Sequence, residues 1–313
     1  MKLPQLNAYL HLLGPTPLAP IRLEDEGPVV WCKLEFLNPS GSTKDRIARH
    51  ILTKAWREGH IRPGSVVLEA SSGSTSIAMA LVSAQFGMRF IAVMPEGVSN
   101  ERVLMIRALG GEIRLTPKEL GIRGSIAETE RLAAECHGFL PCQFSNPENA
   151  TAHAQATARE VLDQIPGGQV DAVVSGVGTG GTLLGLYQGI RESGCEPIPV
   201  HARPVDLGST PEVECCSFSS RIPGVLDCVS QIFRPEELPG LQVIEVRDKD
   251  ALATTRNLMR HGFPVGASSG LNYAAAAEMA RRLGPTAQVV TVLPDRMERY
   301  FTTEVFEPMR CAN

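Results

Sequence analysis

The chain has 313 residues, of which 43% are hydrophobic and 20% are charged, and its formal net charge is −4. This length predicts two domains, and the composition is that of a globular protein with buried cores. The charge gives no global basic field for holding a nucleic acid, and no apolar run of about 18 residues is present to span a membrane.

The cysteines, the histidines and the N-terminal segment indicate the environment of the protein. The eight Cys residues form no CxxC motif, and the seven His residues form neither HExxH nor a pair spaced four apart. These spacings favour free thiols in a reducing compartment and argue against a metal site. The segment MKLPQLNAYLHLLGPTPL lacks the pattern of a secretory signal. We therefore expect a cytoplasmic protein with no metal and no membrane partner.

Short β-prone runs alternate with helical patterns along the chain. The expected strands are 66–69, 90–94, 113–116, 170–175, 197–202, 242–246 and 288–293. The expected helices run from the loop at 71–76 to about 87, over 100–109, 124–137 and 149–165, from the loop at 176–181 to about 192, and over 249–261 and 271–283. This alternation predicts an α/β protein with parallel sheets covered on both faces. A chain break is expected near 145–150, and the irregular stretch 203–241 is interpreted as a functional loop region.

A glycine-rich loop, SGVGTGGT at 175–182, follows an expected strand and opens an expected helix. Its N–H groups and the helix dipole form a cradle for phosphate. Gly176, Gly178 and Gly181 also spell the G-x-G-x-x-G fingerprint of dinucleotide sites. The acidic residue that such a site needs after the next strand is missing, since VHAR occupies 200–203. The loop alone favours a phosphate monoester, with a dinucleotide and a turn that binds no ligand as alternatives.

The segment GASSG at 266–270 matches the G-x-S-x-G nucleophile elbow of α/β-hydrolases. In that fold the catalytic His follows the Ser, whereas the last His of this chain is His261. The hydrolase interpretation therefore lacks a base for the nucleophile. The alternative for this segment alone is a Ser/Gly loop that caps helix 271–283.

Two Ser/Thr-rich segments complete the candidates. In NPSGSTKDR at 38–46, Lys44 lies just inside an expected helix start, where the dipole disfavours a charged amine. That field favours the neutral amine that a Schiff-base lysine needs, with a solvated surface lysine as the alternative. In EASSGSTS at 69–76, hydroxyl and N–H groups form an anion pocket suited to a carboxylate, with an ordinary capping loop as the alternative.

Taken together and in this order, the four loops resemble the cysteine synthase and cystathionine β-synthase family, the fold-type II pyridoxal-phosphate enzymes, and within it the O-acetylserine sulfhydrylase pattern. The resemblance covers nearly the whole chain and is carried by NPSGSTKDR (38–46), GIRGSIAETERLA (121–133), QFSNPEN (143–149), SGVGTGGTLLG (175–185), VGASSGLNYAAA (265–276) and LPDRMERYFTTEVF (293–306). It implies a tryptophan-synthase-β-like α/β fold with two doubly wound parallel-sheet domains. The smaller, mobile substrate-loop domain would be 41–149, and the larger cofactor-phosphate-binding domain would be 1–40 with 150–313.

The resemblance also implies roles for individual residues. The catalytic residue Lys44 would hold pyridoxal 5′-phosphate as a Schiff base and act as the general base. The residues that would bind the cofactor phosphate are Gly178, Thr179, Gly180, Gly181 and Thr182. Ser268 would contact the pyridine nitrogen, and Ser74 occupies the position that faces the cofactor's 3′-oxygen. The residues that would bind the substrate carboxylate are Ser71, Ser72, Gly73, Thr75 and Gln143.

The chain departs from the family pattern at three places. Ser74 stands where the family has Asn, Ser76 stands where it has Gly, and IPGVLDC at 222–228 stands where a Gly-rich segment is expected. The last change concerns the side of the site that faces the leaving group and the nucleophile, so the nucleophile stays open at this point.

These implications predict β-replacement on an O-activated L-serine with sulfide, giving L-cysteine. O-acetylserine is the first choice of substrate, and O-phosphoserine is the second because Arg221 and Arg296 are cations suited to a phosphate leaving group. The alternatives are an amine nucleophile giving 2,3-diaminopropionate or another non-proteinogenic amino acid, a serine/threonine dehydratase, and an inactive relative acting as a binding partner. The expected partners are the amino-acid substrate, a small nucleophile and, by the habit of the family, a second copy in a homodimer.

Overall fold

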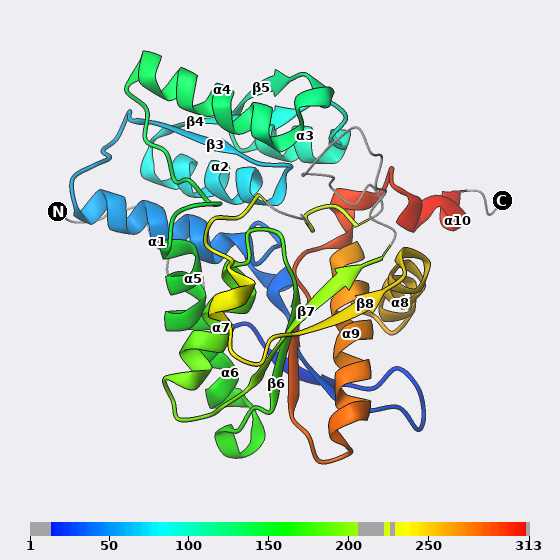
Figure 1. The fold of residues 1–313 in the computed structure, drawn as a ribbon. Coiled ribbons are helices and arrows are strands. Elements are labelled where there is room, and N and C mark those ends of the chain that lie inside the picture. Colours follow the sequence, from blue (N-terminus) through cyan, green and yellow to red (C-terminus); the bar gives the residue numbers. More distant parts are fainter. Residues whose placement is uncertain (1–13, 206–221, 226–228, 311–313) are drawn as a thin grey trace. The chain divides into compact units, whose positions relative to one another are not determined.

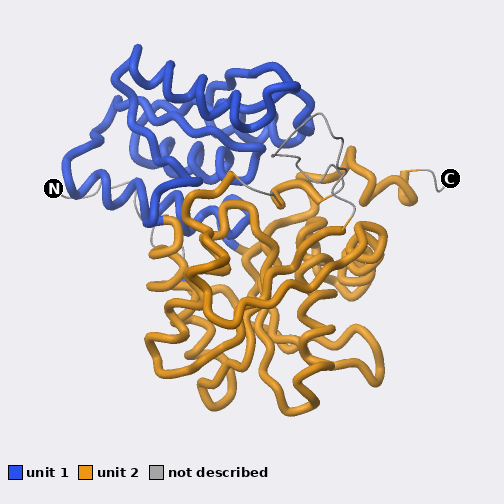
Figure 2. The backbone as a smooth tube through the Cα atoms, in the orientation of Figure 1, with its two compact units in different colours: residues 1–14, 38–148 blue, residues 15–37, 149–313 orange. Residues whose placement is uncertain are grey.

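The computed structural model describes residues 14–205, 222–225 and 229–310, and it divides into two compact units (Figure 2). Of the described residues, unit 1 contains Asn38–Glu148 and also Gly14, which was expected in the larger domain, and unit 2 contains those within Pro15–Leu37 and Asn149–Asn313. The breaks expected from the sequence, 40/41 and 149/150, differ from these by three residues and one residue. Asn149 belongs to unit 2, where its side chain donates a hydrogen bond to Thr179 of the glycine-rich loop.

Unit 1 is built on a parallel sheet in the order β3 (Val66–Ala70), β4 (Arg89–Pro95), β5 (Glu112–Thr116). Its helices are α1 (Lys44–Arg57), α2 (Ser74–Phe86), α3 (Asn100–Ala108) and α4 (Gly121–Cys136). α2 and α4 cover opposite faces of the sheet (Figure 1). Because α2 and α3 begin after β3 and β4, the carboxyl ends of these strands and two helix N-termini meet at one edge, where parallel sheets bind ligands.

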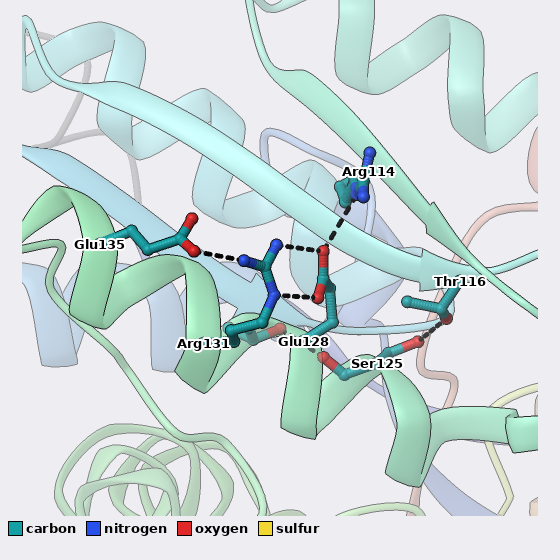
Figure 3. Close-up of polar contacts among 7 residues, drawn as sticks. Arg114, Thr116, Ser125, Glu128, Arg131 and Glu135 are labelled. Carbon is teal, nitrogen blue, oxygen red and sulfur yellow. Dashed lines mark hydrogen bonds and ion pairs between the residues drawn. The ribbon is translucent and has the colours of Figure 1, made fainter.

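Helix α4 is joined to β5 by one buried and one exposed set of polar contacts (Figure 3). The buried hydroxyls of Thr116 and Ser125 lie 2.8 Å apart. On the surface, Glu128 accepts hydrogen bonds from Arg114 (3.0 Å) and Arg131 (2.7 Å). Exposed ion pairs contribute little to stability, whereas a buried hydroxyl must keep its partner, so losing the Thr116–Ser125 contact would cost more than losing the ion pairs.

Unit 2 contains a six-stranded sheet in the order β1-β2-β9-β6-β7-β8, in which all neighbours are parallel except β1 and β2. The strands are β1 (Leu18–Ile21), β2 (Val30–Lys33), β6 (Ala172–Gly176), β7 (Ile198–Pro204), β8 (Gln242–Val246) and β9 (Val289–Val292). The helices are α5 (Glu148–Ala152), a π-helical segment (His153–Ala158), α6 (Arg159–Gln164), α7 (Gly181–Arg191), α8 (Asp248–Arg260), α9 (Ala267–Leu283) and α10 (Glu307–Arg310).

The sheet of unit 2 is buried on both faces. Alternate residues of β6 enter two different cores: Val174 packs with α8 and α9, and Val173 packs with α6 and α7. The two helix layers lie on opposite sides of the strands (Figure 1). Among residues 14–205, 222–225 and 229–310, no helix has both the length and the apolar character needed to cross a membrane.

The expected α/β fold with parallel sheets is confirmed, with two local corrections. No strand is expected before residue 66, whereas β1 and β2 form a hairpin at the edge of the sheet. Pro20 is tolerated in β1 because an edge strand needs fewer backbone N–H donors than an interior one. The segment 266–270, expected as a loop, is largely helical because α9 begins at Ala267. Gly270 is required there because a Cβ at this position would lie 2.1 Å from Ala251 O of α8.

Helix α7 packs against the helical run 148–164 along glycines spaced four apart. A Cβ on Gly185 would lie 2.3 Å from Ala150 O, and one on Gly189 would lie 2.6 Å from Ala154 O. The two helices therefore approach backbone to backbone, and the π-helical segment lies at this contact. This packing sets the position of α7 relative to the loop that precedes it.

Candidate active site

Lys44 is the first residue of α1, and its side chain is half-buried. The Asp45 carboxylate holds the preceding loop, since it accepts hydrogen bonds from Ser40 N (2.8 Å), Ser40 Oγ (2.5 Å) and Ser42 N (3.3 Å). The Lys44 N–H is directed at Ser42 Oγ (3.3 Å), whereas Thr43 makes no capping bond. These contacts fix the backbone that carries the Lys44 amine.

The loop at 71–76 folds around the hydroxyl of Ser71. Ser71 Oγ accepts hydrogen bonds from Gly73 N (2.9 Å) and Ser76 N (3.3 Å). Gly73 has a φ of 148°, and a Cβ there would lie 2.4 Å from Arg102 Cδ. Arg102 Nη1 also donates to Ser72 O (3.3 Å). The loop is thus closed into a turn at the N-terminus of α2, an arrangement suited to a carboxylate.

Gln143 closes this loop from a distant part of unit 1. Thr75 Oγ1 donates to Gln143 Oε1 (2.6 Å), and Gln143 Nε2 donates to Ala70 O (2.6 Å). Behind them, the Glu69 carboxyl accepts from Gln143 N (3.2 Å) and Ala70 N (3.0 Å). Burial raises the pKa of Glu69 to about 8. Unit 1 therefore brings together all five residues predicted for the substrate carboxylate.

The glycine-rich loop of unit 2 joins β6 to α7 and is held through Thr179. Asn149 Nδ2 donates to Thr179 Oγ1 (2.9 Å), and Ser230 Oγ donates to Thr179 O (2.6 Å). Gly181 N lies 3.4 Å from the same Thr179 hydroxyl oxygen. Because the first N–H groups of an α-helix have no intrahelical acceptor, α7 presents donors to this loop.

Two glycines let the loop pass close to neighbouring groups. A Cβ on Gly178 would lie 2.2 Å from Gly224 O, and one on Gly180 would lie 2.3 Å from Phe233 Cβ. Gly180 also has a φ of 80°, which favours glycine. Packing within the protein therefore already requires glycine at these two positions, whether or not a ligand also approaches the loop.

Thr182 and Ser268 lie in the first turns of two different helices of unit 2. The Thr182 hydroxyl is 3.3 Å from Nε2 of the buried His153. Ser268 is half-buried in α9, and that helix is joined to the glycine-rich loop because Asn272 Oδ1 accepts from Gly176 N (2.7 Å). Unit 2 therefore brings together the five residues predicted for the phosphate, and a side chain of α9 ties Ser268's helix to their loop.

Some predicted features fall elsewhere. Arg221 lies outside the described residues, as do 226–228 of the segment expected to face the leaving group. Arg296 forms an ion pair with Glu298 (Nε–Oε1, 2.7 Å), which partly neutralises the cation suggested for a phosphate. Within the ranges that the structure describes, no three His, Cys, Asp or Glu side chains gather in a metal-binding cluster.

Sequence reasoning missed three residues that hold the two loops. In the sequence, Glu69 is a single polar residue at the end of an expected strand, and Asn149 is one of several polar residues in an expected helix. Ser230 lies in a stretch without periodicity. The available signal for Asn149 was the short QFSNPEN segment, whereas the contacts of Ser230 with Thr179 have no local signal.

Comparisons with known proteins show the family of the chain. The family model described as pyridoxal-phosphate dependent enzyme matches residues 9–295. The chain is 37% identical over 308 residues to the cysteine synthase of Staphylococcus aureus (strain Mu50 / ATCC 700699), which covers 95% of this chain and 96% of that protein.

Two solved structures are similar over almost their full lengths. O-ureido-L-serine synthase has a TM-score of 0.87 and 32% identity, covering 99% of this chain and 98% of that one. The O-acetylserine dependent cystathionine β-synthase from Helicobacter pylori has a TM-score of 0.85 and 30% identity, covering 98% and 99%. The similarity therefore extends over both units of the chain.

Proposed function

The chain belongs to the family of pyridoxal-phosphate dependent enzymes, and on this premise we propose that it catalyses β-replacement on O-acetyl-L-serine with sulfide to give L-cysteine. It is an enzyme of the cysteine synthase type, and pyridoxal 5′-phosphate is its cofactor. The observation that carries the proposal is a hydrogen-bond network in unit 1 that joins Gln143 to Thr75 and the rest of the loop 71–76, which we interpret as an anion site. Lys44, the first residue of α1, belongs to the same unit.

The residues of both units fit this cofactor. The N-terminus of α7 and the hydroxyls of Thr179 and Thr182 suit a phosphate monoester. Thr43 Oγ1 in unit 1 and Ser269 Oγ in unit 2 are buried without a hydrogen-bond partner among the described residues. These two hydroxyls adjoin Lys44 and Ser268 in the sequence, so a polar group bound beside those residues would supply their missing partners. We assign the phosphate to Gly178, Thr179, Gly180, Gly181 and Thr182.

Lys44 would carry the cofactor and move the proton. When bound, pyridoxal 5′-phosphate supplies an aldehyde for the substrate amine and a conjugated ring that withdraws electrons from Cα. The N-terminal position of Lys44 in α1 disfavours positive charge on Nζ, which favours the amine as a base. Lys44 Nζ would take the proton from Cα as the Cβ–O bond breaks and acetate leaves; sulfide would then form the new C–S bond at Cβ, and Lys44 Nζ would return the proton to Cα. Asp45 keeps the Lys44 backbone in place through its bonds to Ser40 and Ser42.

The substrate carboxylate would bind at the N-terminus of α2, with contacts from Ser71, Ser72, Gly73, Thr75 and Gln143. The Thr75 hydroxyl hydrogen is already donated to Gln143 Oε1, and one Gln143 Nε2 hydrogen is donated to Ala70 O. We assign the carboxylate to the loop 71–76 at the N-terminus of α2, beside the Gln143 side chain that these two bonds hold in place. Two-point binding of this group orients Cα and Cβ for reaction.

Ser268 supports replacement at Cβ over other reactions of this cofactor. A neutral hydroxyl beside the ring nitrogen, unlike a carboxylate, does not force that nitrogen to stay protonated. The electron sink is then milder, which favours elimination at Cβ over transamination. Ser74, where the family has Asn, has a shorter side chain toward the cofactor's 3′-oxygen, and we assign it a contact there.

The test is a turnover assay on protein reconstituted with pyridoxal 5′-phosphate. O-acetyl-L-serine should shift the visible absorption band, and sulfide should then restore it with release of L-cysteine, detected by mass spectrometry. Lys44→Ala should abolish both changes, and Glu128→Gln, in the ion pairs that join α4 to β5, should leave them intact. Absence of any shift with O-acetyl-L-serine or O-phospho-L-serine would refute the proposal.

A second candidate differs only in the nucleophile. The likeness to a protein named O-ureido-L-serine synthase favours testing nitrogen and oxygen nucleophiles beside sulfide. Formation of 2,3-diaminopropionate from an amine, at a higher kcat/KM than cysteine from sulfide, would make the amine reaction the function. Release of pyruvate without any nucleophile would indicate a dehydratase instead.

A further inference from the structure

Glu69 is a buried acid to which the reaction above assigns no part. It is 3% exposed and occupies the next-to-last position of β3, directly before the loop 71–76. Burial raises the pKa of its carboxyl to about 8, opposed by the hydrogen bonds from two backbone amides.

The two oxygens of Glu69 have different partners. Oε1 accepts from Ala70 N (3.0 Å), and Oε2 accepts from Gln143 N (3.2 Å). The Gln143 side chain makes its own bonds to Ala70 O and Thr75 Oγ1, both 2.6 Å. Glu69 thus fixes the position of the Gln143 backbone. The side-chain amide of Gln143 is thereby directed at the end of β3 and at α2.

We propose that Glu69 is a positioning residue for substrate binding, whose carboxyl bridges Ala70 and Gln143 and so holds the Gln143 amide against the loop 71–76. This proposal rests on the proposed function, because it takes Gln143 and this loop as the site of the substrate carboxylate. A glutamine cannot replace Glu69 in this role. Its side chain has one acceptor oxygen and an NH₂ donor, so one of the two backbone N–H groups would lose its acceptor.

The test compares Glu69→Gln with Glu128→Gln, which removes a carboxyl group from an exposed ion pair of the same unit (Figure 3). In E69Q, the KM for O-acetyl-L-serine should rise at least roughly tenfold, which corresponds to about 1.4 kcal/mol. The kcat, the KM for sulfide and the absorption of the bound cofactor should stay close to those of the wild type. E128Q should change none of these. An unchanged KM for O-acetyl-L-serine in folded E69Q would overturn the proposal.

A double-mutant cycle separates positioning from general damage to the fold. If Glu69 acts through Gln143, the KM of E69Q/Q143A should equal that of Gln143→Ala alone. In the double variant the Gln143 side-chain amide is already absent, so E69Q cannot displace it. Independent, multiplicative effects would contradict the proposal. Should E69Q fail to fold, Glu69→Asp replaces it, since the shorter acid does not reach both N–H groups; an unchanged KM in E69D would likewise overturn the proposal.

A measurement without turnover distinguishes this proposal from the proposed function. Amide hydrogen exchange at Gln143 should be faster in E69Q than in the wild type and in E128Q, since the N–H loses its acceptor. If the wild type turned over no O-activated serine, the proposed function would fail. Equal exchange at Gln143 in wild type and E69Q would instead show that Glu69 does not hold this backbone.

Discussion

Replacing Gly185 by Ala tests whether the contact between α7 and the helical run 148–164 is as close as the backbones suggest. The added methyl would lie 2.3 Å from Ala150 O and 2.6 Å from His153 Cβ, and neither atom is the end of a flexible side chain. Overpacking of this kind costs about 1–3 kcal/mol. A helical Gly→Ala change also returns roughly 0.5–1 kcal/mol of helix propensity. Packing outweighs propensity, so we expect a net loss of about 1–2 kcal/mol in the free energy of unfolding.

The assay is thermal unfolding of G185A beside Gln188→Ala, a change at an exposed position of the same helix. The Tm of G185A should fall by about 2–4 °C for each kcal/mol lost, and Q188A should stay near the wild type. The affinity for pyridoxal 5′-phosphate should fall as well, because α7 carries the glycine-rich loop at its N-terminus. A G185A protein more stable than the wild type would mean that propensity decides at this position, and the packing argument would be refuted.

Three further predictions concern the loops and the buried polar groups. Gly178→Ala should weaken binding of pyridoxal 5′-phosphate roughly tenfold or more in an absorbance titration, because its Cβ would lie 2.2 Å from Gly224 O. Thr116→Val leaves the buried Ser125 hydroxyl without this partner and should lower the unfolding free energy by about 1–3 kcal/mol in urea titrations. Because burial raises the pKa of Glu69 to about 8, the folded state holds this proton more tightly than the unfolded state. Its stabilisation is complete below about pH 4.5 and is lost as the pH rises to about 8. The unfolding free energy of the wild type relative to E69Q should therefore fall across that window, by about 1.4 kcal/mol per unit of pKa shift.

Much of the fold was predictable where the pattern is local. The expected strands 242–246 and 288–293 fall on β8 and β9, because apolar β-branched runs between turn residues are legible without tertiary information. The strand β2 ends instead on Lys33, a residue that normally signals the surface. Lys33 is fully buried because Nζ pairs with Glu160 at 2.7 Å, and that partner lies far along the chain.

The residues of the candidate site also divide into those that a local motif identifies and those that only a distant partner explains. Lys44 and the glycine-rich loop stand in contiguous motifs, so the sequence was sufficient to single them out. Glu69 and Asn149 were missed, because what distinguishes them is their partners, Gln143 and Thr179, in other parts of the chain. The first turn of α9 was read as a loop for a related reason, since Gly270 is explained only by the approach of α8.

The interrupted order of unit 2 has a consequence for biosynthesis. Trp31 of β2 pairs with Val290 of β9, so the β1–β2 hairpin is synthesised long before its parallel neighbour in the sheet. The intervening residues 38–148 of unit 1 are all synthesised long before β9. Because contacts of such large sequence separation form slowly, unit 1 is expected to fold on the ribosome first. Until β9 is synthesised, the apolar side chains of Val30 and Cys32 lack part of the core in which they are finally buried.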